Sequence, residues 1–194
     1  MLRQLRPALL SVLLFTALCG VLFPAVITAV SQAVFHRQAN GSLVERDGRI
    51  VGSELIGQGF SAPGYFHSRP SAAGAGYDGS ASGGTNLGPT SEKLINGTRD
   101  LVVAYRRENG LAEDAAVPAD AVTRSASGLD PHISPANAEL QAARVARARG
   151  LPAETVRRLI RENTQGRQLG ILGEPRVNVL KLNLALDRAA PSHS

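Results

Sequence analysis

Sulfur is scarce in this chain: its 194 residues include one cysteine and one methionine, and tryptophan is absent. The cysteine, Cys19, lies inside a long uncharged stretch near the start. The part of the chain beyond that stretch can therefore form neither an internal disulfide nor a thiolate metal site. Its stability must come from packing and hydrogen bonds.

Charged residues are absent from residues 8–35. At about 28 residues this stretch exceeds the roughly 20 that a helix needs to cross a bilayer, so we expect a membrane helix here. The chain then divides into a terminus (residues 1–7), the membrane helix (8–35) and one further domain (36–194). The anchor includes these large apolar side chains: Leu9, Leu13, Phe15, Leu22 and Ile27.

The residues that flank this helix indicate its orientation. Arg3 and Arg6 precede it and Arg37 follows it, and basic residues near a first span resist translocation. We therefore expect a cytoplasmic N-terminus and an extracytoplasmic domain. The alternative is a cleaved secretory signal with its cleavage site at residues 31–33, but the apolar core is about twice the length of such a signal.

Basic residues outnumber acidic ones by 21 to 16, which gives a net charge of +5 and a pI near 10.1. This balance is typical of chains that meet nucleic acid, anionic lipid or an acidic protein. Nucleic acid is the least expected of the three for a domain beyond a membrane. With 20 glycines and 11 prolines, much of that domain is expected to be ordered loop.

The roughly 155 residues after the anchor suit one domain with a single core. Residues 42–54 predict a hairpin that turns at Asp47 and Gly48, and residues 55–90 predict an ordered loop platform. Helices are expected at residues 91–109 with Thr90 as cap, at 134–150, and in a third segment opened by Pro152. Strands are expected at residues 121–123 and 176–186, so the fold class is α+β.

The last expected strand carries leucines at every second position, from Leu180 to Leu186. This alternation is the period of a half-buried strand, which we place centrally in the sheet. Val177 and Val179 have the opposite phase, and we interpret this as a bulge near Val179.

Several motifs are candidates for chemistry, but each lacks part of its context. Residues 74–79 have the G-x-G-x-x-G spacing of a dinucleotide site without the strand and helix that it needs, so we expect loop turns. Residues 82–86 and the pair Thr90 and Lys93 suggest a serine hydrolase, but the supporting motifs do not follow.

Histidines, aspartates and arginines leave further alternatives open. His67 and His132, with Asp78 and Asp130, are a conceivable metal set, but no short His-x-x-x-His spacing exists, and we favour bonds to loop backbones. Seven arginines between residues 144 and 167 form either the solvated side of two helices or a basic face toward lipid or an acidic partner.

Three long blocks together go beyond composition. The first joins residues 52–60, 65–71 and 82–89; the second joins 120–123, 127–134 and 141–146; the third runs through 173–180 to 182–186. In these blocks the chain resembles the C subunit of the bacterial potassium-transporting Kdp ATPase. Departures are small: Thr85 stands where the family usually has Ser, and Ser91 where Asn is common.

The resemblance implies an inner-membrane complex of four parts. Its partners would be a channel-like subunit that selects K⁺, a P-type subunit that hydrolyses ATP, and a small peptide, together with membrane lipid. This chain has no D-K-T-G-T segment and no K⁺ filter motif, so it is expected to be a non-catalytic accessory subunit.

The resemblance implies a catalytic chaperone that raises the ATP affinity of the hydrolysing subunit. In that role ATP is the one small molecule that this chain would be expected to bind. An alternative is an extracytoplasmic cap that shapes K⁺ entry, and another is a membrane-anchored enzyme using His67, Asp130 and His132. The candidate interface or structural-loop residues are Gln58, Phe60, Tyr65, His67, Arg69, Ser82, Asn86, Asp130 and His132.

Overall fold

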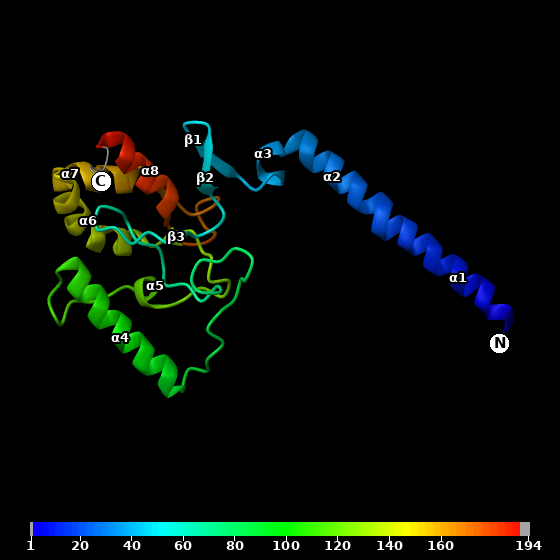
Figure 1. Cartoon of the computed structure of the whole chain (residues 1–194), viewed down its shortest axis with the longest axis horizontal. Coiled ribbons are helices and arrows are strands. Elements are labelled where there is room, and N and C mark those ends of the chain that lie inside the picture. The colour runs from blue at the N-terminus through cyan, green and yellow to red at the C-terminus, as the bar shows by residue number, and fades with distance from the viewer. Residues whose placement is uncertain (1, 191–194) are drawn as a thin grey trace. The chain divides into compact units, whose positions relative to one another are not determined.

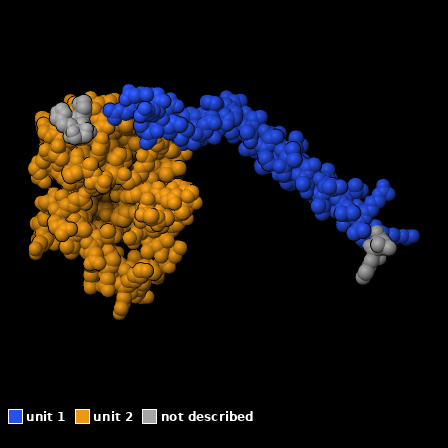
Figure 2. All heavy atoms as spheres, viewed as in Figure 1, with its two compact units in different colours: residues 1–51 blue, residues 52–194 orange. Residues whose placement is uncertain are grey.

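A computed structural model describes residues 2–190 and contains two compact units, residues 1–51 and 52–194 (Figure 2). Residues 191–194, the end of the expected 36–194 domain, lie outside the described part. Each unit is built from its own local sequence signals.

The first unit begins with α1 (Leu2–Ala17), a π-helical turn (Leu18–Leu22) and α2 (Phe23–Val34) (Figure 1). Together they give one helix, Arg3–Val34, that is long and apolar enough to cross a membrane. The five expected anchor side chains are between 49% and 65% exposed, so the chain itself does not cover them. Such a surface is stable only in lipid or against another apolar helix.

The π-helical turn has a local cause. It ends two residues before Pro24, which has no N–H to donate to the carbonyl four residues earlier. The N–H of Phe23 instead bonds the carbonyl of Leu18, five residues back. Proline thus widens the helix near its middle without ending it.

After α3 (His36–Ala39), strands β1 (Leu43–Arg46) and β2 (Arg49–Ser53) form the predicted hairpin. Its turn residues, Asp47 and Gly48, both have positive φ angles, 52° and 72°. This is the backbone of a type I′ turn, whose twist matches that of the flanking strands.

The second unit is an α+β domain, and the predicted fold class is confirmed (Figure 1). Its three-stranded antiparallel sheet has the order β3-β5-β4, with Val177 of the middle strand opposite Ile133 and Thr164. The elements are α4 (Glu92–Asn109), α5 (Ala119–Val122), β3 (His132–Ile133), α6 (Pro135–Arg149), α7 (Ala153–Glu162), β4 (Thr164–Gln165), β5 (Arg176–Asn178) and α8 (Val179–Ala189).

Three predicted helices are confirmed, and their ends follow the predicted residues. The Ser134 hydroxyl accepts the backbone N–H of Asn137 at 3.1 Å, which caps α6 just before Pro135. Gly110 and Gly150 end α4 and α6 in the left-handed conformation. The one cap correction is at α4, where Ser91 rather than Thr90 is the capping residue.

The long final strand was a wrong prediction. Only Arg176–Asn178 is strand, and from Val179 the chain is the helix α8. The side chain of Asn178 accepts the backbone N–H of Lys181 at 3.1 Å and starts this helix. The phase change at Val179, which we interpreted as a bulge, is therefore the boundary between strand and helix.

The expected strand at residues 121–123 was also wrong, because Ala119–Val122 is a single helical turn, α5. Its Ala121 and Val122 are buried in a small cluster with Tyr105 of α4. These residues are apolar because they are buried against α4, and not because they belong to a strand in a sheet.

Helix α6 is central to the domain, packing against α7, α4 and β5. In Figure 1, α7 and α8 lie on one side of the domain and α4 lies on the other. The main core collects one face of α6, the faces of α7 and α8, the sheet and one loop residue: Phe66, Ile133, Ala138, Ala142, Val145, Ala146, Val156, Leu159, Ile160, Val177, Val179, Leu182, Ala185 and Leu186.

Candidate functional site

Helix α6 presents a stripe of polar side chains to the interior. Asn137, Gln141 and Arg144 recur at intervals of three and four residues, so they lie on one face of the helix. All three are buried, Asn137 and Gln141 to within 1% exposure. Buried polar groups need partners, and these organise the loop platform.

Two side-chain amides hold the platform backbone in an extended form. Gln141 accepts the N–H of His67 at 2.8 Å and donates to its carbonyl at 3.2 Å. Asn183 of α8 does the same for Phe66, at 2.8 and 2.9 Å. Each amide replaces a neighbouring strand, so the loop is fixed without belonging to the sheet.

Arg144 completes this arrangement. Its guanidinium donates to the carbonyls of Pro63 and Tyr65 at 2.6 and 2.9 Å, and to the side chains of Asn109 and Gln141 at 3.0 and 2.8 Å. A planar group with five donors suits this task, which a lysine could fulfil only in part. Arg144 therefore connects α4, α6 and the loop.

The same polar chain continues to the start of α6. Tyr105 donates to the side chain of Asn137 at 2.8 Å, and Asn137 donates to Asp120 at 3.0 Å. Asp120 also accepts from the hydroxyl and the N–H of Ser134. Burial, reinforced by the Asp120 charge, raises the pKa of Tyr105, which keeps its hydroxyl a donor.

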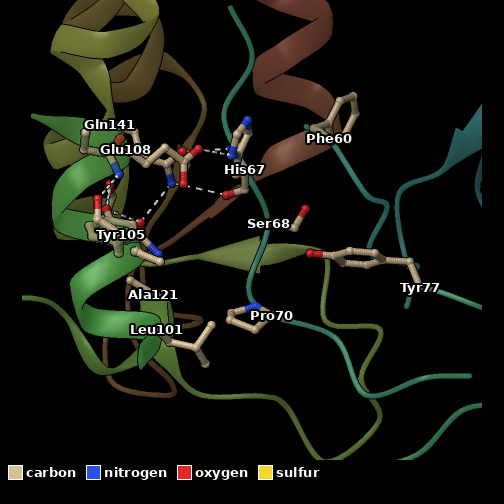
Figure 3. Close-up of a pocket in the computed structure, with 13 residues that line it drawn as sticks. Phe60, His67, Ser68, Pro70, Tyr77, Leu101, Tyr105, Glu108, Ala121 and Gln141 are labelled. Atoms are coloured by element: carbon tan, nitrogen blue, oxygen red, sulfur yellow. Dashed lines mark hydrogen bonds and ion pairs between the residues drawn. The ribbon is translucent and has the colours of Figure 1, made fainter. Parts of the chain in front are cut away.

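A cleft of about 200 Å³ opens beside this network, lined by α4, α6 and the loop (Figure 3). At its wall, Nδ1 of His67 lies 2.6 Å from a carboxylate oxygen of Glu108. The hydrogen bond from His67 lowers the pKa of Glu108 despite its partial burial. The other ring nitrogen of His67 lies 3.1 Å from the Ala62 carbonyl, so both nitrogens are engaged in local structure.

A second polar group joins Arg69, Asp130 and His132. Arg69 donates to Asp130 at 2.9 Å, and the backbone N–H of His132 donates to the other carboxylate oxygen at 3.0 Å. Partial burial would raise the pKa of Asp130, but the hydrogen bonds from His132 and Arg69 outweigh it and lower that pKa to about 2. The carboxylate is thus held charged.

Backbone contacts seal the loop platform against residues 127–132. Gly57 donates its N–H to the carbonyl of Leu129 at 2.7 Å, and the Ser71 hydroxyl donates to the carbonyl of Gly128 at 2.6 Å. A β-carbon on Gly57 would lie 2.6 Å from the Asp130 carbonyl oxygen, so glycine is required there. The two segments behave as one surface.

A larger groove of about 510 Å³ lies between the first half of α4, residues 84–87 and residues 122–126. It carries two cations, Lys93 and Arg124, beside the hydroxyls of Thr98 and Ser125, and no carboxylate of the described residues lines it. Within residues 2–190 neither cation forms an ion pair. The groove therefore suits an anion.

The nine predicted site residues fall into these arrangements unequally. Tyr65, His67, Arg69, Asp130 and His132 belong to the networks above. The ring of Phe60 packs at a tilt against that of Tyr65, with 5.5 Å between the ring centroids. The others have smaller roles: the Gln58 carbonyl accepts from Ser68, the Ser82 hydroxyl donates to the Ser127 carbonyl, and Asn86 lines the larger groove.

The conceivable metal set is not brought together. His67 pairs with Glu108, Asp130 and His132 lie in the other group, and Asp78 accepts from Ser80. Across residues 2–190 no three His, Cys, Asp or Glu side chains could hold one metal ion. Residues 74–79 form loop turns, with positive φ at Gly74 and Gly76.

The arginine cluster divides, and neither interpretation of it holds for the whole. Arg144 and Arg149 are interior groups: Arg149 lies 2.8 Å from Asp187 and 4.5 Å from the centre of the Tyr65 ring. Four of the exposed arginines form surface ion pairs: Arg157 with Glu139 of α6, Arg158 with Glu162, Arg161 with Glu154 at 2.7 Å, and Arg167 with Glu174. Interior guanidiniums are needed because loop carbonyls face the helices without strand partners.

Three amide residues of these networks, Asn137, Gln141 and Asn183, were not among the predicted site residues. A signal existed for two of them, because Ser134, Asn137 and Gln141 are spaced as one helix face. That face was easily mistaken for the solvent side. Asn183 had no such signal once its segment was predicted as strand.

Comparison with known proteins gives one consistent answer. Residues 5–188 match the family described as KdpC: K+-transporting ATPase, c chain. A protein of Mycobacterium tuberculosis (strain H37Rv) named "Potassium-transporting ATPase KdpC subunit" is 58% identical over 186 residues, covering 96% of this chain and 98% of that one. Proteins of the same name from Caulobacter vibrioides (strain NA1000) and Gemmatimonas aurantiaca are 57% and 56% identical, over 98% and 96% of this chain and 96% and 94% of theirs.

Proposed function

The chain belongs to the KdpC family of K⁺-transporting ATPase c chains, and from that premise we propose that its domain is a rigid, non-catalytic cap on the outer side of the complex. The complex would comprise a channel-like K⁺ subunit, a P-type ATP-hydrolysing subunit and a small peptide. The domain would hold this assembly together and shape K⁺ entry.

The observation that carries the proposal is the closed loop platform. Arg69 and Asp130 join it to residues 127–132 at 2.9 Å. His67 is bonded to Glu108 of α4 and to the Ala62 carbonyl, and His132 is paired with Asp130. Groups so fully engaged suit a docking surface of fixed shape. The enzyme alternative requires some of the same groups to be free for a substrate.

The flanking charges support an outer location. Arg3 and Arg6 lie at the N-terminal end of the candidate span, before the uncharged residues 8–35, which favours a cytoplasmic start and a domain on the far side from cytoplasmic ATP. The complex would then reside in the bacterial inner membrane with this chain crossing it once.

Thiol labelling in intact cells tests this location. Cys19→Ala removes the native thiol, and Ala112→Cys places a new one in an exposed loop after α4. A reagent that enters the periplasm but not the cytoplasm should label this position without lysis. Labelling only after lysis would place the domain on the cytoplasmic side and exclude the proposal that it caps the outer side of the complex.

A matched control keeps the result interpretable. Gln4→Cys, near the other end of the span, keeps both flanking arginines and should show the opposite pattern. If both positions are labelled in intact cells, the reagent has crossed the membrane and a larger reagent must replace it.

A second candidate is the nucleotide chaperone, in which this chain helps the hydrolysing subunit to bind ATP. The larger groove favours it, because its volume and its two cations suit a nucleotide phosphate. Lys93 and Arg124 would hold the phosphates there, while Thr98 and Ser125 offer further hydrogen bonds.

ATP binding by the purified complex tests the second candidate. Lys93→Ala with Arg124→Ala should weaken ATP binding about tenfold or more if the groove holds the phosphates. Arg99→Ala, on the same helix but outside the groove, is the matched control. Unchanged ATP affinity in the double variant would show that this groove does not bind the ATP phosphates.

A further inference from the structure

The hairpin that joins β4 to β5 displays three large apolar side chains at its tip. Leu169, Ile171 and Leu172 are 88%, 75% and 55% exposed, and residues 165–175 are all exposed. Gln168 and Leu172 close the tip with paired backbone hydrogen bonds, both 2.9 Å long. We define residues 167–174 as the apolar tip.

The backbone of the apolar tip has a conformation that is unfavourable for one of its own residues, Leu169. Leu169 has a φ of 53° and is followed by Gly170 at 78°. A left-handed turn favours glycine or asparagine, and a bulky apolar residue there is strained. In the isolated chain Leu169 is thus unfavourable in two ways: its backbone has a positive φ angle, and its apolar side chain is exposed to water.

Strain of this kind persists at functional positions, where an interaction compensates for it. Contiguous exposed apolar side chains mark contact sites with protein or membrane. The structure assigns the apolar tip as a docking knob that inserts into an apolar pocket on another subunit of the transport ATPase. This inference rests on the proposed function only in requiring a multisubunit complex.

Charge favours a protein pocket over lipid as the occupant. Arg167 donates to both carboxylate oxygens of Glu174 at 2.8 Å, so the tip neutralises its own charge. Segments that bind bilayers through surface contacts combine apolar residues with unpaired basic ones, and tryptophan or tyrosine at the interface. Residues 167–174 contain neither an aromatic residue nor a second basic one.

Photo-crosslinking in membranes that contain the whole complex identifies the occupant. A photoreactive amino acid at position 169 should crosslink to one of the other subunits, identified by mass spectrometry. The same amino acid at position 103, an equally apolar and 64% exposed site on α4, is the control and should not give that product. Products with lipid alone, or with a second copy of this chain, would overturn the assignment.

Substitutions separate docking from folding. Leu169→Asn with Ile171→Ser should preserve or raise the thermal stability of the chain, because both changes suit an exposed turn. The affinity for the rest of the complex should fall about tenfold or more, since buried apolar anchors dominate interfaces. Val103→Ser should change neither quantity.

Wild-type affinity in the tip double variant would overturn the inference. The proposed function has a separate readout, because thiol labelling reports the side of the domain whether or not the tip docks. If the tip variant assembles normally, the docking inference fails but the proposed outer location of the domain is unaffected. If labelling places the domain inside, the proposed location fails but the docking inference is unaffected.

Discussion

Asn183 and Phe66 are 117 residues apart in the chain, yet one side chain satisfies both backbone groups of the other residue. Oδ1 of Asn183 accepts the Phe66 N–H at 2.8 Å, and its Nδ2 donates to the Phe66 carbonyl at 2.9 Å. Both residues are fully buried. The ring of Phe66 enters the main core because its backbone is held in this way.

Removing that amide should destabilise the domain strongly. Asn183→Ala leaves a buried N–H and a buried carbonyl without partners, at roughly 1–3 kcal/mol each. We expect the free energy of unfolding to fall by about 2–5 kcal/mol in denaturant titrations of the full chain in detergent. Asn163→Ala removes one half-buried bond to the Leu159 carbonyl and should cost about 1 kcal/mol. Equal losses in the two variants would contradict the role of the Asn183 amide in holding the Phe66 backbone.

Gly57 should tolerate no side chain. Gly57→Ala places a carbon 2.6 Å from the Asp130 carbonyl oxygen, so the platform must separate from residues 127–132. We expect a loss of about 1–3 kcal/mol in unfolding free energy. Gly79→Ala, with nothing within 4 Å of the new carbon, should stay within about 0.5 kcal/mol of the parent. A stable Gly57→Ala variant would show that this contact is dispensable.

Acid should weaken the platform through Asp130. Its pKa is about 2 in the folded chain and near 3.9 when unfolded, so the unfolded state binds a proton first as the pH falls. The stabilisation is therefore complete above about pH 4 and is lost between about pH 4 and 2. The side chain is 30% exposed, which limits the effect to about 1–2 kcal/mol.

Urea titrations at several pH values between these limits measure this loss. Asp130→Asn should unfold more easily near neutral pH and show a shallower decline below pH 4. Asp114→Asn, at an exposed position, should follow the parent curve. A parent-like acid slope in Asp130→Asn would assign the decline to other carboxylates.

The histidines should be dispensable for transport chemistry. His67→Ala and His132→Ala each remove local bonds, to Glu108 and to Asp130, without touching a reacting atom under the cap proposal. We expect nearly normal potassium-limited growth in a strain that depends on this complex. Copurification of the other subunits must accompany the growth assay, since only lost growth with intact assembly would revive the enzyme alternative.

Local signals in the sequence predicted the elements that close within a few residues. Asp47 and Gly48 turn the first hairpin, Ser134 and Gly150 bound α6, and Pro152 precedes α7. In each case the deciding hydrogen bonds or φ angles are local. These parts of the fold could therefore be read without knowing the tertiary structure.

Segments whose structure depends on distant partners were harder to predict. Leucine alternation after Val179 suits a strand or a helix, and the Asn178 cap with burial on two sides decides for the helix. The site was predicted on the loop side, at His67 and Asp130, but not on the helix side, at Gln141. Amide side chains that substitute for a strand have no sequence pattern of their own.

Contacts between the start of the domain and its last elements also set the order in which the domain can assemble. Tyr65 reaches Asp187 across 122 residues, and the carbonyl of Glu54 accepts from Asn178 across 124. The opening segment of the domain thus has no stable place until α8 exists. A nascent chain on the ribosome, with its last helix still in the exit tunnel, must stay incompletely folded, so premature termination before α8 should leave a product for proteolysis rather than a smaller working domain.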